Sequence, residues 1–357
     1  MSSGPDSAVS RETETRIEES VPGVDSTSNV QTSNVQTSNA EASNAGTDVE
    51  RDFDDDFTAP YAELSPDTPI AVAAHRASQI MNPESVTLPR PAHRRVLTIA
   101  NQKGGVGKTT TAVNLASALA VQGLTVLVVD LDPQGNASTA LGVAHNSGTP
   151  SSYELLLGEV TAAEAVQKSP HNDRLYCIPA TIDLAGAEIE LVSMVAREGR
   201  LKNALSEEKL ADIDADYVLI DCPPSLGLLT VNALVAAKEV VIPIQCEYYA
   251  LEGVGQLLRN IELVQAHLNP ELHVSTVLLT MYDGRTKLAD QVAEEVRSHF
   301  GNAVLRSVIP RSVKVSEAPG YGMTVLDYDP GSRGAMSYLD AGRELAARAI
   351  TKQEQER

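Results

Sequence analysis

Short apolar runs alternate with segments of helical periodicity from about Arg95 to the end of the chain. A strand that is covered on both faces reads as an uninterrupted run of Val, Ile and Leu. Such runs lie at 96–100, 125–129, 175–179, 217–220, 240–244, 274–279 and 304–309. Helical spacing of apolar residues marks 109–122, 183–197, 228–237, 251–267, 287–299 and 333–350. This alternation predicts an α/β fold, with a doubly wound, mostly parallel sheet and helices on both faces.

The first 90 residues lack this periodicity. They are rich in Ser, Thr, Asn, Asp and Glu, and a five-residue near-repeat runs from Thr27 to Gly46. Such a segment buries too little apolar area to offset its loss of conformational entropy. We therefore predict a disordered, low-complexity acidic arm over 1–90, a folded domain over 94–350 and a polar tail over 351–357. Amphipathic spacing at 68–81 is compatible with a short helix that docks on the domain or a partner, or forms only transiently.

The net charge and the distribution of apolar residues exclude some classes of function. The formal net charge is -20, and the first 90 residues hold 16 of the 48 acidic but only 5 of the 28 basic residues. A chain this acidic is not a general polyanion binder, so contact with nucleic acid requires a local basic patch. The sequence contains no run of about 18 apolar residues and begins without a signal-peptide pattern. These features predict a cytoplasmic protein.

The three cysteines, Cys177, Cys222 and Cys246, are far apart in the sequence and form no C-x-x-C pair. This spacing argues against a disulfide framework and against a zinc or iron–sulfur site. We expect buried thiols that pack as small apolar side chains.

A glycine-rich loop, NQKGGVGKTT at 101–110, joins the first predicted strand to a predicted helix. Its glycines let backbone N–H groups surround phosphate oxygens, and the helix N-terminus adds partial positive charge. In such a loop Lys108 contacts the β- and γ-phosphates and the Thr109 hydroxyl binds Mg²⁺. The predicted nucleotide-binding residues here are Lys103, Gly104, Gly105, Val106, Gly107, Lys108, Thr109 and Thr110.

Carboxylates follow two further strands at the same end of the predicted sheet. Asp130 and Asp132 end the second strand, so that one of them can support the metal while the other orients a water molecule. Asp221 follows the aliphatic run at 217–220, the arrangement in which a carboxylate holds Mg²⁺, usually through water.

The phosphate loop departs from the usual pattern, because Gln102 stands where the first glycine is expected and Lys103 is an additional lysine. KGGVGKT resembles the deviant loop of the ParA and MinD partition ATPases, the nitrogenase iron protein and the arsenite pump ATPase. From about Arg94 to Ile350 the chain resembles ParA-type ATPases, in VLVVDLDPQGNAS, YVLIDCPPSLGLLTVNAL and IPRSVKVSEAPGYG among other stretches. This resemblance implies a P-loop NTPase-type fold.

The resemblance also implies roles for individual residues. The enzyme would hydrolyse ATP with Mg²⁺, slowly without a stimulating partner. Lys103 would cross a dimer interface to the nucleotide of the other subunit and act with Lys108 and Asp132 in catalysis. Asp132 would position or activate the attacking water. The metal would be held by Thr109, Asp132 and Asp221.

The implied partners are a second copy of the chain, DNA of any sequence and a ParB-type centromere-binding protein. The ATP-bound homodimer would bind DNA, and the ParB-type protein would stimulate hydrolysis, so that a nucleoid-associated cycle segregates a chromosome or plasmid. Family DNA-contacting positions match Arg285 and Lys314, with Arg311 close by. Met281 and Pro310 are the expected adenine contacts.

Three other functions are known for folds that carry a loop of this kind or follow from its chemistry. A MinD-like ATPase that cycles on membranes needs a bulky, basic amphipathic C-terminal helix, whereas ELAARAITKQEQER is polar and mixed in charge. We therefore expect no stable membrane association. An iron–sulfur carrier on the same fold is disfavoured by the cysteine spacing. A nucleotide-gated adaptor that barely hydrolyses ATP is the third function, and a slow basal rate alone does not exclude it.

Overall fold

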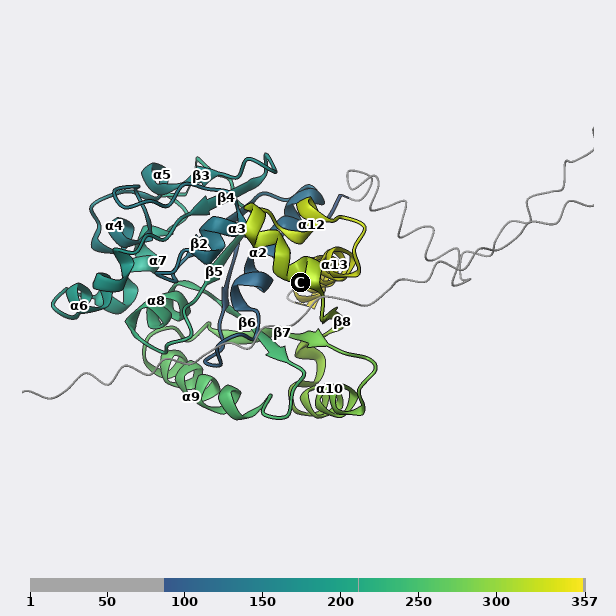
Figure 1. The fold of residues 1–357 in the computed structure, drawn as a ribbon. Coiled ribbons are helices and arrows are strands. Elements are labelled where there is room, and N and C mark those ends of the chain that lie inside the picture. Colours follow the sequence, from purple (N-terminus) through teal and green to yellow (C-terminus); the bar gives the residue numbers. More distant parts are fainter. Residues whose placement is uncertain (1–86, 211, 356–357) are drawn as a thin grey trace, which may run out of the picture. The chain divides into compact units, whose positions relative to one another are not determined.

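A computed structural model describes residues 87–210 and 212–355. The predicted arm, up to residue 86, and the possible helix at 68–81 lie outside these residues. The described part contains an eight-stranded sheet in the order β3-β4-β2-β5-β1-β6-β7-β8 (Figure 1). The strands are β1 (Arg95–Ile99), β2 (Val126–Asp130), β3 (Gln167–Lys168), β4 (Leu175–Ile178), β5 (Tyr217–Asp221), β6 (Glu239–Gln245), β7 (His273–Tyr282) and β8 (Val304–Pro310).

All pairs in this sheet are parallel except β3 with β4. Every apolar run that was predicted as a strand forms one, within a few residues at its ends. No pattern along the chain predicts β3, because its two residues are polar and too few to show a period. The α/β prediction with a doubly wound, mostly parallel sheet is confirmed.

Helices cover both faces of the sheet. They are α2 (Lys108–Val121), α3 (Asn136–Ala140), α4 (Ser152–Leu157), α5 (Ala162–Ala165), α6 (Leu184–Val192), α7 (Arg200–Ala204), α8 (Leu228–Ala236), α9 (Glu252–His267), α10 (Lys287–Phe300), α11 (Val313–Glu317), α12 (Val325–Tyr328) and α13 (Arg333–Gln355), with 3-10 turns η2 (Arg197–Gly199), η3 (Gly301–Ala303) and η4 (Ala318–Tyr321). One apolar cluster joins α2, α3, α12 and α13 to the sheet. On the opposite face, a second cluster packs helices α4 through α8 against the sheet, and a third packs helices α8 through α10 against it. Figure 1 shows α13 and α10 on opposite sides of β8.

The predicted helix at 183–197 is too long. Helix α6 ends at Val192, and the chain then turns through Ala196, whose φ is 52°, into η2. The apolar spacing continues to Val195, but Val192 and Val195 are exposed and do not pack on the core. The last helix runs through Gln355, into the segment predicted as a polar tail. Among the described helices, none is both long and apolar enough to cross a membrane.

Candidate active site

The three central strands bring the predicted carboxylates and the phosphate loop to one edge of the sheet. β5 lies between β1 and β2, with Asp221 in register with Ile99 on one side and Asp130 on the other. The loop that follows β1 ends at Gly107, the N-cap of α2, where φ is 87°. A left-handed backbone is strained for residues with a Cβ, so the tight entry into α2 needs glycine at this position.

Two buried side chains outside the predicted site hold the phosphate loop in place. The Asn101 side chain donates to the Pro243 carbonyl at 2.8 Å and accepts from the Lys103 N–H at 3.0 Å. The Thr280 hydroxyl donates to the Val106 carbonyl at 2.8 Å. Sequence reasoning missed both roles. The only signal was position, because Asn101 is the first residue of the loop and Thr280 lies near the carboxyl end of β7, two strands away from β1 in the sheet.

Replacing Thr280 with valine keeps the shape of the side chain but leaves the buried Val106 carbonyl without its donor. An unsatisfied buried polar group costs about 1–3 kcal/mol, so we expect a loss of that size in the free energy of unfolding, together with weaker nucleotide binding. Chemical denaturation and nucleotide titration measure the two effects. Thr280→Ser is the control, since it retains the hydroxyl. Equal nucleotide affinity in the valine variant would contradict this role.

Lys108, the first residue of α2, is buried beside the carboxylates. Its ammonium donates to the Lys103 carbonyl at 3.4 Å. Burial lowers the pKa of Lys108, and the negative charges of Asp221 and Asp132 oppose this shift. A cation is thus held between the loop backbone and the acidic cluster.

Asp221 is a fully buried carboxylate at the end of β5. Both of its carboxylate oxygens are buried and, within the described residues, have no hydrogen-bond partner. Burial raises the pKa of Asp221 well above its usual value, the charge of Asp130 adds to this, and the nearby Thr109 hydroxyl opposes it. Orphaned carboxylate oxygens beside a hydroxyl form a hard oxygen donor set, which fits Mg²⁺.

Asp130 and Asp132 are held in different ways. Asp130 is fully buried and accepts hydrogen bonds from the Ser138 N–H at 2.9 Å, the Ser138 hydroxyl at 2.7 Å and the Asp132 N–H at 3.1 Å. Burial raises its pKa to about 6. Asp132 accepts from the Gln134 N–H at 3.0 Å through Oδ1. Asp130 therefore fixes the turn into α3. Asp132 lies near enough to Lys108 for their charges to interact, and among the described residues its Oδ2 accepts no hydrogen bond.

The expected adenine contacts lie at the ends of two paired strands, β7 and the edge strand β8. Pro310 ends β8 in register with Tyr282 of β7, the residue after Met281. Met281 and Pro310 are half-buried, and Met281 has a φ of 50°. The pairing of β7 with β8 thus brings the two predicted contacts to one place.

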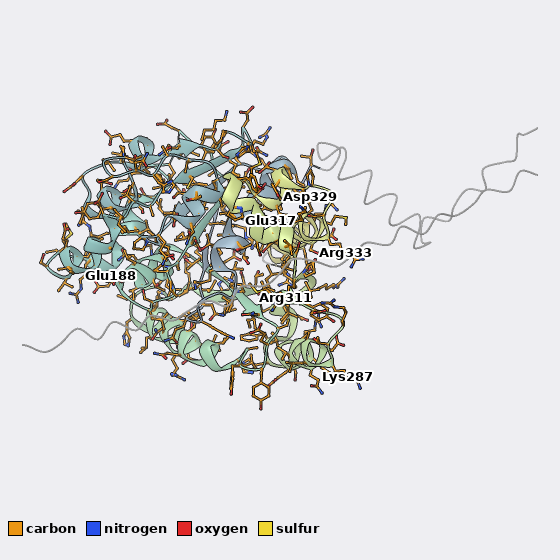
Figure 2. The ribbon with its side chains drawn as sticks, viewed as in Figure 1. Glu188, Lys287, Arg311, Glu317, Asp329 and Arg333 are labelled. Atoms are coloured by element: carbon orange, nitrogen blue, oxygen red, sulfur yellow. The ribbon has the colours of Figure 1, made fainter. Side chains whose placement is uncertain are left out.

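The three basic residues predicted to contact DNA are exposed, and each is ion-paired. Arg285 pairs with Asp283 at 2.7 Å, Arg311 with Glu247 at 3.0 Å and Lys314 with Glu317 at 3.3 Å. The Arg311 N–H donates to the Tyr282 carbonyl, which ties the loop after β8 to the loop that carries Arg285. In Figure 2, Arg311 and Glu317 lie on the side of α11–α13, and Glu188 lies far from them across the view.

Comparisons with known proteins cover this same part of the chain. A family model described as an AAA domain matches residues 94–274. Soj, the sporulation initiation inhibitor protein of Bacillus subtilis, is 53% identical over 253 residues, which are 71% of this chain and 98% of Soj. The chromosome partitioning protein ParA of Caulobacter vibrioides is 52% identical over 259 residues, 72% of this chain and 96% of that protein. The chain belongs to the ParA/Soj family of chromosome-partitioning ATPases.

Solved structures place this ParA-family chain among nucleotide-binding proteins. A Mycobacterium smegmatis structure titled cobyrinic acid a,c-diamide synthase, with bound ADP and magnesium, is 41% identical with a TM-score of 0.62, covering 74% of this chain and 97% of that one. MinD from Pyrococcus horikoshii, complexed with Mg-ADP, is 26% identical with a TM-score of 0.57, covering 73% and 99%. The family and the P-loop NTPase-type fold expected from the sequence are confirmed. The three cysteines are buried, as expected.

Proposed function

We propose that this ParA/Soj-family protein is an ATP-dependent DNA-partitioning ATPase. Its ATP-bound dimer binds DNA of any sequence on the nucleoid, and a ParB-type centromere-binding protein stimulates an otherwise slow hydrolysis that releases the DNA. Repeated cycles segregate a chromosome or plasmid. The observation that carries the proposal is the convergence of Lys108, the orphaned Asp221 carboxylate and Asp132 on one phosphate loop.

The residues present fit ATP with Mg²⁺, and similar structures hold magnesium with ADP or with an ATP analogue. Asp221 and Thr109 would hold the metal, with Asp132 nearby, and bound Mg²⁺ neutralises charge on the phosphate oxygens. The loop N–H groups from Gly104 to Thr110 and the Lys108 ammonium bind the phosphates. Asp132, fixed through Oδ1, orients the attacking water with its second oxygen.

Two contacts support a role for Lys103 outside its own loop. The Lys103 backbone N–H is fixed by Asn101, and Gly253 near the start of α9 puts no side chain against Lys103, whereas a Cβ there would lie 3.5 Å from the Lys103 Cβ. The side chain is half-buried. We propose that the Lys103 ammonium reaches the phosphates of the nucleotide held by a second copy, which makes the dimer depend on ATP.

DNA binding requires the basic residues to exchange partners. Arg285, Arg311 and Lys314 are exposed, and an exposed ion pair contributes only about 0–1 kcal/mol, so a phosphate can replace its carboxylate at small cost. Each phosphate contact releases counterions, which makes binding weaken with salt. One such patch on an acidic domain binds weakly, whereas a dimer presents two patches at once.

Charge reversal at this surface tests the proposal. We expect the double variant Arg285→Glu, Lys314→Glu to lose ATP-dependent DNA retention and to keep ATP-dependent dimers, because neither residue belongs to the nucleotide site. The matched control is Lys238→Glu. Lys238 is also exposed and ion-paired, to Glu271 at 2.9 Å. It precedes β6 and so lies at the amino ends of the parallel strands, whereas Arg285 and Lys314 follow the carboxyl ends of β7 and β8. Unchanged affinity and salt slope in the double variant would place the DNA surface elsewhere.

Binding of random-sequence duplex DNA with ATP, with ADP and without nucleotide tests the cycle itself. Retention only with ATP, weakening steeply between low and high salt, is the expected result. Absence of DNA binding in every nucleotide state, despite ATP-dependent dimers, would contradict the DNA-partitioning function and favour an adaptor or membrane-cycling ATPase.

A further inference from the structure

Helix α6 and its flanking turns carry a row of exposed apolar side chains. The members, named here the α6 stripe, are Ile182, Ala185, Ile189, Val192 and Val195. The four large ones are 68%, 79%, 60% and 89% exposed in that order. The core-facing side of the same helix is separate and consists of Leu184, Ala187 and Leu191. The stripe is therefore not part of the packed interior.

Within α6, the stripe has the spacing of a helix–helix contact. Ala185, Ile189 and Val192 follow one another at intervals of four and three residues, as do the apolar positions that form the seam between two packed helices. Ile182 and Val195 extend the stripe into the turns on either side of the helix. Side chains exposed singly are common on protein surfaces, but a contiguous apolar patch marks an interaction site. A helical partner with an apolar face of the same spacing fits this row.

The charges around the α6 stripe favour a basic helix as its partner. From Thr181 to Ala196 the chain has three carboxylates and no lysine or arginine. Arg197, the next residue, donates to the Val192 carbonyl at 2.9 Å, and its charge is paired with Glu198 at 2.9 Å. Asp183 accepts from the Ser147 hydroxyl, Glu190 from the Tyr153 hydroxyl and Glu188 from the Leu229 N–H, so their charges are not balanced by these partners. A basic helix is attracted to such a rim. A second copy, which brings the same carboxylates, and an anionic lipid surface are repelled.

Glu188 connects this surface to the active site. Its carboxylate reaches the start of α8, where it accepts from the Leu229 N–H at 3.4 Å and fills the space that a Cβ at Gly227 would occupy. A carboxylate at a helix N-terminus is stabilised by the helix dipole. The loop that leads into α8 begins directly after Asp221, so a partner on α6 acts one contact away from that loop.

We propose that the α6 stripe is the docking surface for a basic amphipathic helix of the protein that stimulates ATP hydrolysis. The inference rests on the proposed function and adds to it the surface that the stimulating partner uses. Binding there holds α6, and through Glu188 the start of α8, in one position. The loop after Asp221 is thereby fixed relative to the phosphate loop and Asp132.

The test measures ATP turnover against the concentration of the ParB-type protein, with DNA present. In Ile189→Asp and in Val195→Asp, we expect the half-maximal partner concentration to rise about tenfold or more, as for a central apolar contact of an interface. Basal turnover and ATP affinity should stay unchanged, since neither residue belongs to the nucleotide site. Val195 lies in a turn after α6, so its variant does not depend on a stable α6 surface.

Leu263→Asp is the matched control, because Leu263 is 58% exposed on α9, away from α6. Normal stimulation of this control together with weakened stimulation of both α6 variants supports the proposal. Normal stimulation of the α6 variants overturns it, and so does loss of ATP-dependent dimers in Ile189→Asp without partner, which would make a second copy the occupant. A wild-type protein that the ParB-type protein does not stimulate contradicts the proposed function instead.

Discussion

Asp132→Ala is expected to bind ATP with wild-type affinity and to lose its partner-stimulated turnover. The Asp132 carboxylate is fixed by the Gln134 N–H, whereas in the proposed site the phosphate contacts come from the loop and Lys108. Removing a group that orients or deprotonates the nucleophile lowers a rate by about 10²–10⁴-fold. Single-turnover phosphate release and a nucleotide titration measure the two quantities. DNA complexes of this variant should also last longer, since release follows hydrolysis.

Asp173→Ala serves as the control for this experiment. Asp173 is an exposed carboxylate that pairs with Lys168 at the β3–β4 edge of the sheet, so turnover should not change. Retention of partner-stimulated turnover in Asp132→Ala would show that another group positions the water. A wild-type protein that binds ATP but never turns over with its partner would favour the nucleotide-gated adaptor.

Asp221→Asn is expected to stabilise the nucleotide-free protein and to weaken its binding of Mg-ATP. The buried Asp221 carboxylate has no hydrogen-bond partner within the described residues, and an unsatisfied buried group costs about 1–3 kcal/mol, more when charged. A neutral amide lowers this cost. Without nucleotide the variant should therefore have the higher Tm, and with Mg-ATP the order should reverse. Thermal denaturation with and without Mg-ATP makes both comparisons.

The pH dependence of this difference follows from the raised pKa of Asp221. The folded state binds the Asp221 proton more tightly than the unfolded state, so stability falls as pH rises from the unfolded pKa to the folded pKa. The cost of the charge is fully present above the folded pKa. The advantage of Asp221→Asn should therefore be largest at alkaline pH and should disappear in acid.

Asp216→Asn is a control with the opposite expected sign. Asp216 is also buried, but it accepts from the Thr125 N–H at 2.7 Å and pairs with Arg90 at 3.1 Å. The same substitution there removes a favourable charge interaction and should lower the Tm without nucleotide. A lower Tm for both variants would mean that the Asp221 carboxylate is well satisfied in the nucleotide-free protein.

Most of the sheet, and the convergence of the phosphate loop and the carboxylates at one end of it, could be predicted from the sequence. Parallel strands that are covered on both faces, such as β2 and β5, have uninterrupted apolar runs, and their ends mark where Asp130 and Asp221 stand. The phosphate loop is a local motif whose glycines and lysines follow one another in the chain. Such features depend on residues that are close together in the chain, so the sequence alone is enough to predict them.

Contacts between distant segments could not be predicted in this way. Thr280 binds the carbonyl of Val106 across the sheet, and a threonine near a strand end looks like any other β-branched residue. Helix α6 ends early because Val192 and Val195 lie outside the core, although their spacing continues the helical pattern. In both cases the deciding quantity is which surface a neighbouring element covers.

The position of β1 within the sheet has a consequence for how the protein is made. β1 comes first along the chain among the strands, yet it pairs only with β5 and β6. Arg95 and its β5 partner Tyr217 are 122 residues apart. At a synthesis rate of about 5–20 residues per second, β1 leaves the ribosome on the order of 10 s before a neighbouring strand exists. During that interval β1 lacks both of the strands that flank it in the folded domain, so we expect a ribosome-bound chain that ends before β5 not to bind ATP.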